Sequence, residues 1–97
     1  MDTLEYQAHV SRVGEDMMRA AENVWMAAEN KIKGSDREAA IDFARTKLAE
    51  YDAVDAQLLE DSKVLQAQFA KRFADDVELI RDSLARIDAE AKPGNEP

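Results

Sequence analysis

The chain has 97 residues, of which 45% are hydrophobic and 35% are charged, and it contains no cysteine. Its 21 acidic and 13 basic side chains give a formal net charge of -8, which disfavours nucleic acid or an anionic membrane as a ligand, because both need clustered Lys and Arg. Disulfides and thiolate metal sites are excluded. The sequence predicts one small domain in a cytoplasmic protein that binds neither nucleic acid nor membranes.

The composition predicts an all-α fold. Only three Gly and two Pro are present, too few for the turns of a small β-protein, and the commonest residues are strong helix formers. Residues 1–91 are predicted to form a single helical domain. Residues 92–97 carry both prolines, and we expect them to be a disordered tail.

The first helix is predicted over residues 3–33. Thr3 is a possible N-cap, Glu5 lies in the first turn, and Gly34 is well placed to end the helix in a left-handed conformation. The apolar residues along one side of this helix repeat with heptad spacing, which is typical of a seam packed against another helix. This seam consists of Tyr6, Val10, Val13, Met17, Ala20, Val24 and Ala27.

A second apolar stripe accompanies this seam and consists of Leu4, Met18, Trp25 and Ile32. A helix with a wide apolar face normally packs against two other helices, so we expect the stripe to be core. Tryptophan is also enriched at binding hot spots, and methionine adapts to irregular partners. The stripe, together with Met26, is therefore a candidate protein interface as well.

The second helix is predicted to start at a capping box formed by Ser35 and Glu38. Two architectures fit the rest of the chain. Residues 35–91 could form one long helix in an antiparallel hairpin that dimerises. Alternatively, a break near Asp61 and Ser62 gives helices over residues 35–61 and 62–91 and a three-helix bundle with coiled-coil-like packing. The two apolar stripes of the first helix favour the bundle, and we expect a homodimer.

The C-terminal third of the chain carries another apolar series, which consists of Phe69, Phe73, Val77, Ile80, Leu84 and Ile87. In a three-helix monomer this series is core. In a dimer of hairpins it is the interface. It is therefore the second candidate for a protein-binding surface.

Residues suited to catalysis or metal binding are sparse. His9 is the only histidine, and it shares a helix face with Glu5, but one imidazole and one carboxylate are too few for a zinc site. No glycine-rich phosphate loop occurs, and the many carboxylates are expected on solvated helix faces. The sequence predicts no enzyme, no cofactor and no metal.

The function expected from these features is binding to another protein through helix packing. In size and expected architecture the chain is similar to small acidic helical secretion chaperones and antiactivators, an analogy that implies a regulator or adaptor. One alternative is an acidic mimic of nucleic acid that blocks a DNA-binding protein. Another is a structural subunit whose function is self-assembly.

Overall fold

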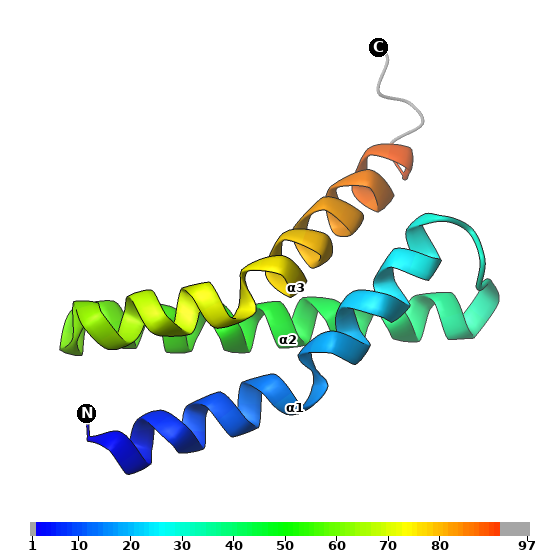
Figure 1. Cartoon of the computed structure of the whole chain (residues 1–97). Coiled ribbons are helices and arrows are strands. Elements are labelled where there is room, and N and C mark those ends of the chain that lie inside the picture. Colours follow the sequence, from blue (N-terminus) through cyan, green and yellow to red (C-terminus); the bar gives the residue numbers. More distant parts are fainter. Residues whose placement is uncertain (1, 92–97) are drawn as a thin grey trace.

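The computed structural model describes residues 2–91, which form three α-helices: α1 (Thr3–Ala28), α2 (Gly34–Asp61) and α3 (Lys63–Glu90). The chain reverses direction after α1 and again after α2, so α1 and α3 run the same way and α2 runs antiparallel to both (Figure 1). Each helix packs against both others, in a bundle with principal extents of 48 × 29 × 17 Å. The predicted three-helix bundle is confirmed. The predicted tail at 92–97 lies outside the described residues.

The first helix begins at Thr3, as predicted, but its N-cap is the residue before. Asp2 is the N-cap: its Oδ1 accepts from the backbone N–H of Glu5 at 2.8 Å, and the Glu5 carboxylate accepts from the Asp2 N–H at 3.3 Å. This reciprocal pairing needs an acidic side chain three residues after the cap, and Glu5 stands in that position relative to Asp2 but not to Thr3. The assignment of Thr3 as the cap was wrong.

The end of α1 also differs from the prediction. The helix stops at Ala28, well before Lys33, and Asn30 takes the left-handed conformation with φ 60°. Asparagine tolerates this conformation better than most residues, so it can end a helix as glycine does. Gly34 is left-handed too, with φ 64°, but it opens α2.

The capping box predicted at Ser35 and Glu38 is not formed. Helix α2 already begins at Gly34, with Lys33 at the N-cap and no side-chain hydrogen bond to the cap. The backbone N–H of Arg37 donates to the Lys33 carbonyl at 3.4 Å. This early start places Ser35 inside the first turn, where its hydroxyl no longer has the geometry of a cap.

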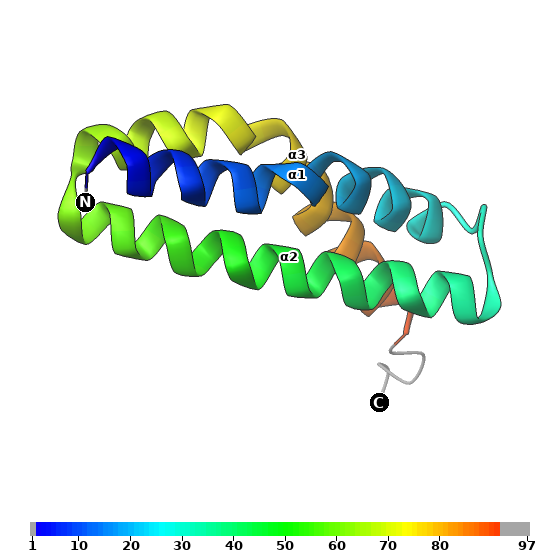
Figure 2. The ribbon, with the colours of Figure 1, turned by 90° about the horizontal axis from the view of Figure 1, so that it is seen from below.

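The predicted break between the second and third helices lies at Ser62 (Figure 2). Ser62 is extended (φ -161°, ψ 107°), its N–H donates to the Leu58 carbonyl at 2.6 Å, and its Oγ accepts from the Leu65 N–H at 3.3 Å. One residue thus ends α2 and caps α3, which separates residues 35–91 into two helices.

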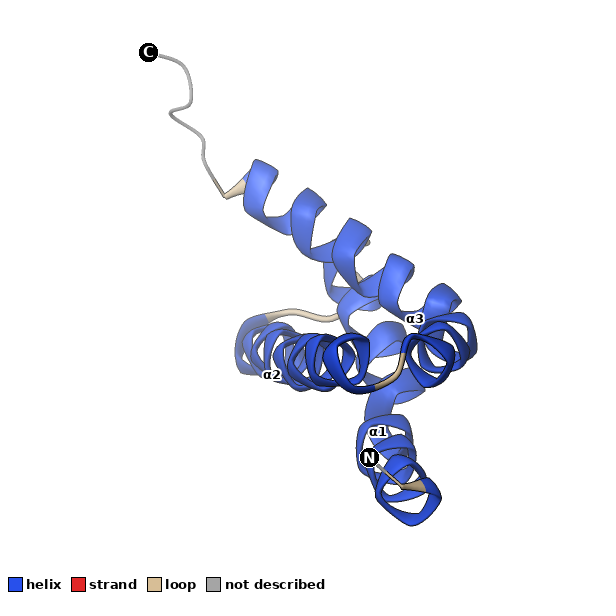
Figure 3. Cartoon of the chain, turned by 90° about the vertical axis from the view of Figure 1, so that its left-hand side faces the viewer, coloured by secondary structure: helices blue, strands red, loops and turns tan. Residues whose placement is uncertain are grey.

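The core lies between the three helices (Figure 3). The heptad seam of α1 is buried from Val13 onward, while Tyr6 and Val10 are half-buried. Where α2 meets α3, Tyr51 stacks on Phe69 with centroids 5.0 Å apart, and Phe73 meets Phe69 edge to face at 5.2 Å. Such aromatic pairs add to the free energy of burial through their preferred geometry.

Candidate functional site

The C-terminal apolar series proposed as an interface is core in this bundle. The side chains of Phe69, Phe73, Val77, Ile80, Leu84 and Ile87 are all buried. The turn at Ser62 folds α3 back on the other two helices, and a series that an unbroken helix would have left open is thereby covered. In this fold these residues are not accessible to a partner.

The second stripe of α1 has the opposite outcome, because most of it is exposed. Leu4 is 78% exposed, Met18 61% and Trp25 38%, while Met26 and Ile32 are half-buried. The expectation that this stripe is core was wrong. The small residues beside it, Ala21 and Ala28, are buried instead, so neighbouring helices approach α1 at those positions and leave the larger side chains outside.

Met18, Trp25, Glu22 and Glu29 share one face of α1, because they recur at helical spacing. This face adjoins α3. The Glu29 carboxylate accepts from Arg86 Nη1 at 2.7 Å, and Glu22 is near enough to Asp76 to act on its charge. Trp25 lies between these two glutamates in sequence and on the same side of the helix. Its indole is also within 5.7 Å of the Lys31 ammonium.

The acidic side chains of α3 adjoin this face. Burial raises the pKa of Asp76, and the negative charges of Asp75 and then Glu22 raise it further. Leu79, which is half-buried, lies in a shallow hollow of about 270 Å³ that is lined by acids. We use the term α1–α3 face for the surface formed by Met18, Glu22 and Trp25 of α1 with Asp75, Asp76, Leu79 and Asp82 of α3.

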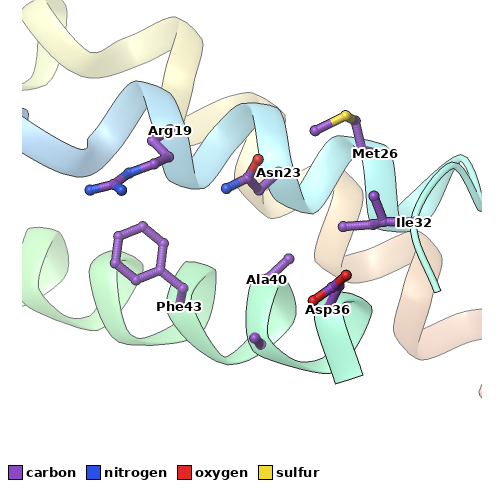
Figure 4. A pocket seen from close by; sticks show the side chains of 8 residues that line it. Arg19, Asn23, Met26, Ile32, Asp36, Ala40 and Phe43 are labelled. Atoms are coloured by element: carbon purple, nitrogen blue, oxygen red, sulfur yellow. The ribbon is translucent and has the colours of Figure 1, made fainter. Parts of the chain in front are cut away.

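A larger pocket of about 510 Å³ lies on the other side of α1, between its C-terminal half and the start of α2 (Figure 4). Its lining is Arg19, Asn23, Met26, Ile32, Asp36, Ala39, Ala40 and Phe43. The Arg19 guanidinium stands 5.6 Å from the centre of the Phe43 ring and is held by Asp16 at 2.6 Å. The hydrogen bond from Arg19 lowers the pKa of Asp16.

Sequence reasoning did not find this pocket, although it named two of its residues, Met26 and Ile32. The early end of α1 decides its shape, since Ile32 belongs to the connection that precedes α2 and not to α1. The types of the other lining residues do not indicate a pocket, because residues such as Asn23 and Ala39 are ordinary on a helix surface. The pocket is open, and its mixture of polar and apolar side chains includes no arrangement of a nucleophile with a base.

Within residues 2–91, no group of three or more His, Asp or Glu side chains could hold a metal ion. The Nδ1 of His9 lies 2.8 Å from an Arg12 nitrogen. In the same part of the chain, no helix combines the length and the apolar character that crossing a bilayer requires. Comparison of the chain with protein-family models, with curated proteins and with solved structures gave no match.

Proposed function

We propose that this chain is a small protein-binding regulator or adaptor that acts through helix packing and performs no catalysis. The observation that carries the proposal is the exposure of Met18 and Trp25 on one face of α1. The buried seams of all three helices are already closed within the chain. These two large side chains are thus available to a partner without any opening of the fold.

The residue types suit this role. Tryptophan supplies a large contact area with little conformational entropy to lose, and methionine can adapt to several shapes. The pocket lined by Met26 and Ile32 lies on the other side of α1, next to α2. A partner helix laid along α1 would cover Trp25 and place a side chain in this pocket or against Leu79 of α3.

A second copy of the chain is one possible partner, and the expected homodimer remains a prediction. In the bundle the apolar series of α3 is buried, so such an interface would use side chains that are exposed, such as Met18 and Trp25 of α1. As a second candidate, an acidic mimic of nucleic acid is supported by the carboxylates of Asp75, Glu78 and Asp82 around one hollow of α3. Binding of such a mimic would fall steeply with added salt.

Site-specific photocrosslinking tests the proposal. A photoreactive phenylalanine analogue replaces Met18, and in a matched control it replaces Val64, which is 67% exposed at the start of α3. Irradiation in the cells that encode the chain is expected to link position 18, but not position 64, to one defined protein. A product that contains only this chain would make self-association the function. No product at position 18, or equal products at both, would overturn the proposal.

A further inference from the structure

The pocket of about 510 Å³ between α1 and α2 has the size and the lining of a site for a small organic molecule (Figure 4). Such sites usually measure about 300–1,000 Å³ and combine an apolar wall with a few polar groups. Here Met26, Ile32 and Phe43 are half-buried and contribute apolar surface to the lining. On the side of α2 the lining includes Ala39 and Ala40, whose short side chains leave the space open.

The polar groups of the pocket stand at its two ends. Arg19 lies at one end, with Asn23 one turn further along α1, and Asp36 lies at the other end (Figure 4). On α1 the lining extends from Arg19 to Met26, which corresponds to about 10 Å along the helix axis. A molecule of that length can therefore contact both ends while its middle lies against the apolar side chains.

The side chains at the Arg19 end have N–H donors to spare. Among the described residues, Arg19 donates only from Nη2, to Asp16 at 2.6 Å, and the Asn23 side chain makes no hydrogen bond. A guanidinium carries several N–H donors in a planar fork, and an amide carries two. Residues four apart on a helix are neighbours, so Arg19 and Asn23 can donate to one group. This arrangement suits a carboxylate.

Ion pairs beside the pocket balance the charge at this end. The Asp16 carboxylate lies between Arg19, at 2.6 Å, and Lys47, at 3.6 Å, and Lys47 also meets Glu50 at 3.1 Å. Both cations stand close to the ring of Phe43, at 5.6 and 5.7 Å from its centre. These two bases and two acids carry no net charge, so the formal charge of -8 is carried by other side chains.

The opposite end of the pocket has the opposite preference. Within residues 2–91, the Asp36 carboxylate forms no ion pair and accepts no side-chain hydrogen bond. An ionised carboxylate only accepts hydrogen bonds. The group of a ligand that meets Asp36 is therefore a donor, such as a hydroxyl or an amine.

We infer that this pocket binds a small organic carboxylate with an apolar body about 10 Å long and a hydrogen-bond donor at its far end. The carboxylate accepts from Arg19 and Asn23, and the donor meets Asp36. The inference goes beyond the proposed function, because the pocket lies on the other side of α1 from Met18 and Trp25. The α1–α3 face stays accessible when the pocket is filled.

Three matched molecules test the chemistry by titration into the isotope-labelled full chain, followed by NMR. Phenylbutyrate, with its ring at the end of the chain, supplies the carboxylate and the apolar body. We expect it to shift the amide signals of Asn23, Ile32 and Phe43 saturably, with a dissociation constant on the order of 1 mM for a ligand of this size. Its para-amino derivative adds the donor and should bind about two- to tenfold more tightly. Phenylbutanol, with a neutral hydroxyl in place of the carboxylate, should bind about three- to tenfold more weakly.

Two pairs of variants locate the binding. Ala39→Leu fills the pocket and should weaken phenylbutyrate at least about tenfold, while Ala74→Leu, at an exposed position of α3, should change its binding less than about twofold. Arg19→Gln should weaken phenylbutyrate about three- to tenfold but leave phenylbutanol unchanged. Lys71→Gln makes the same change of charge at an exposed position of α3 and should affect neither. Circular dichroism verifies that each variant keeps its helices.

The inference is overturned if phenylbutyrate does not bind at about ten times the expected constant, or if phenylbutanol binds equally well. Equal losses in the two leucine variants, or in the two glutamine variants, would also overturn it, because the binding would then not be located at this pocket. None of these results bears on the crosslink from position 18, which tests the proposed function separately.

Discussion

The ring of Phe73 occupies the space that a side chain at Gly14 would need. A β-carbon at Gly14 would stand 3.0 Å from Cζ and 3.1 Å from Cε1 of Phe73. The Phe73 ring is buried and is packed on its other sides by Phe69 and Tyr51. The glycine inside α1 is therefore a packing requirement of the contact between α1 and α3.

Gly14→Ala tests this relationship. An exposed helical Gly→Ala change gains up to about 1 kcal/mol of stability. Here the ring has little room to move, and overpacking costs about 1–3 kcal/mol. We expect a net loss of about 1 kcal/mol in the free energy of unfolding, measured by urea denaturation. The double variant Gly14→Ala with Phe73→Leu should show no further cost from the alanine, and a net gain in the single variant would contradict the argument.

Gly34→Ala should destabilise the chain for a different reason. No atom lies within 4 Å of the position of a β-carbon at Gly34, so space is not limiting, but the backbone has φ +64°. A non-glycine residue in this conformation costs about 1–2 kcal/mol. We expect a loss of about 1 kcal/mol by urea denaturation. Gly34→Asn is the control, since asparagine tolerates this conformation and should recover part of the loss.

Ser62→Ala removes the cap of α3. The hydroxyl accepts from the Leu65 N–H, and loss of a serine N-cap costs about 1 kcal/mol. We expect that decrease in the free energy of unfolding, while Ser62→Asp should retain most of the stability because a carboxylate can accept the same hydrogen bond. If alanine and aspartate gave equal stability, the side chain of Ser62 would not be a stabilising cap.

The raised pKa of Asp76 predicts a pH dependence. Because burial and neighbouring carboxylates raise this pKa above its ordinary value of 3.8, the folded chain holds the proton more tightly than the unfolded chain. The stabilisation from this group is complete below the unfolded value and is lost as the pH rises through the folded pKa. Asp76→Asn should therefore unfold at higher urea concentration than the parent near neutral pH.

The difference between this variant and its parent should shrink as the pH falls below about 4. Asp75→Asn is the matched control, because Asp75 is exposed, and it should change stability less. Glu22→Gln should lower the pKa of Asp76 in an NMR titration of the carboxyl carbon. An unchanged pKa would show that the charge of Glu22 does not act on Asp76 in solution.

Trp25→Ala and Val24→Ala compare the loss of stability at a surface position with the loss at the adjacent core position. Val24 is fully buried and Trp25 is partly exposed, so we expect Val24→Ala to cost about 2 kcal/mol and Trp25→Ala less than about 1 kcal/mol. Both are measured by urea denaturation. Trp25→Ala, but not Val24→Ala, should also abolish the crosslink from position 18. Equal losses of stability would place Trp25 in the core.

The sequence by itself determined the helical class and the heptad seam of α1, and it offered the break near Ser62 as one of two architectures. These features depend on local propensity, on capping chemistry and on spacing, all of which are written along the chain. The cap at Asp2 also follows from the sequence, because Glu5 stands three residues after Asp2, as a capping box requires. The sequence does not decide where α1 ends. Asn30 and Gly34 can each adopt the left-handed conformation, and only one of them ends the helix.

The tertiary structure alone decided which apolar stripe is buried. The residues Met18, Trp25 and Phe69 are all suited to a core, and spacing cannot tell which of them another helix will cover. Phe69 is covered because α3 folds back, while the neighbouring helices cover Ala21 and Ala28 of α1 and leave Met18 and Trp25 outside. The effect of the Glu22 charge on the pKa of Asp76 likewise joins residues distant in sequence. Such relationships arise from helix register and rotation, which depend on the packing of the whole bundle.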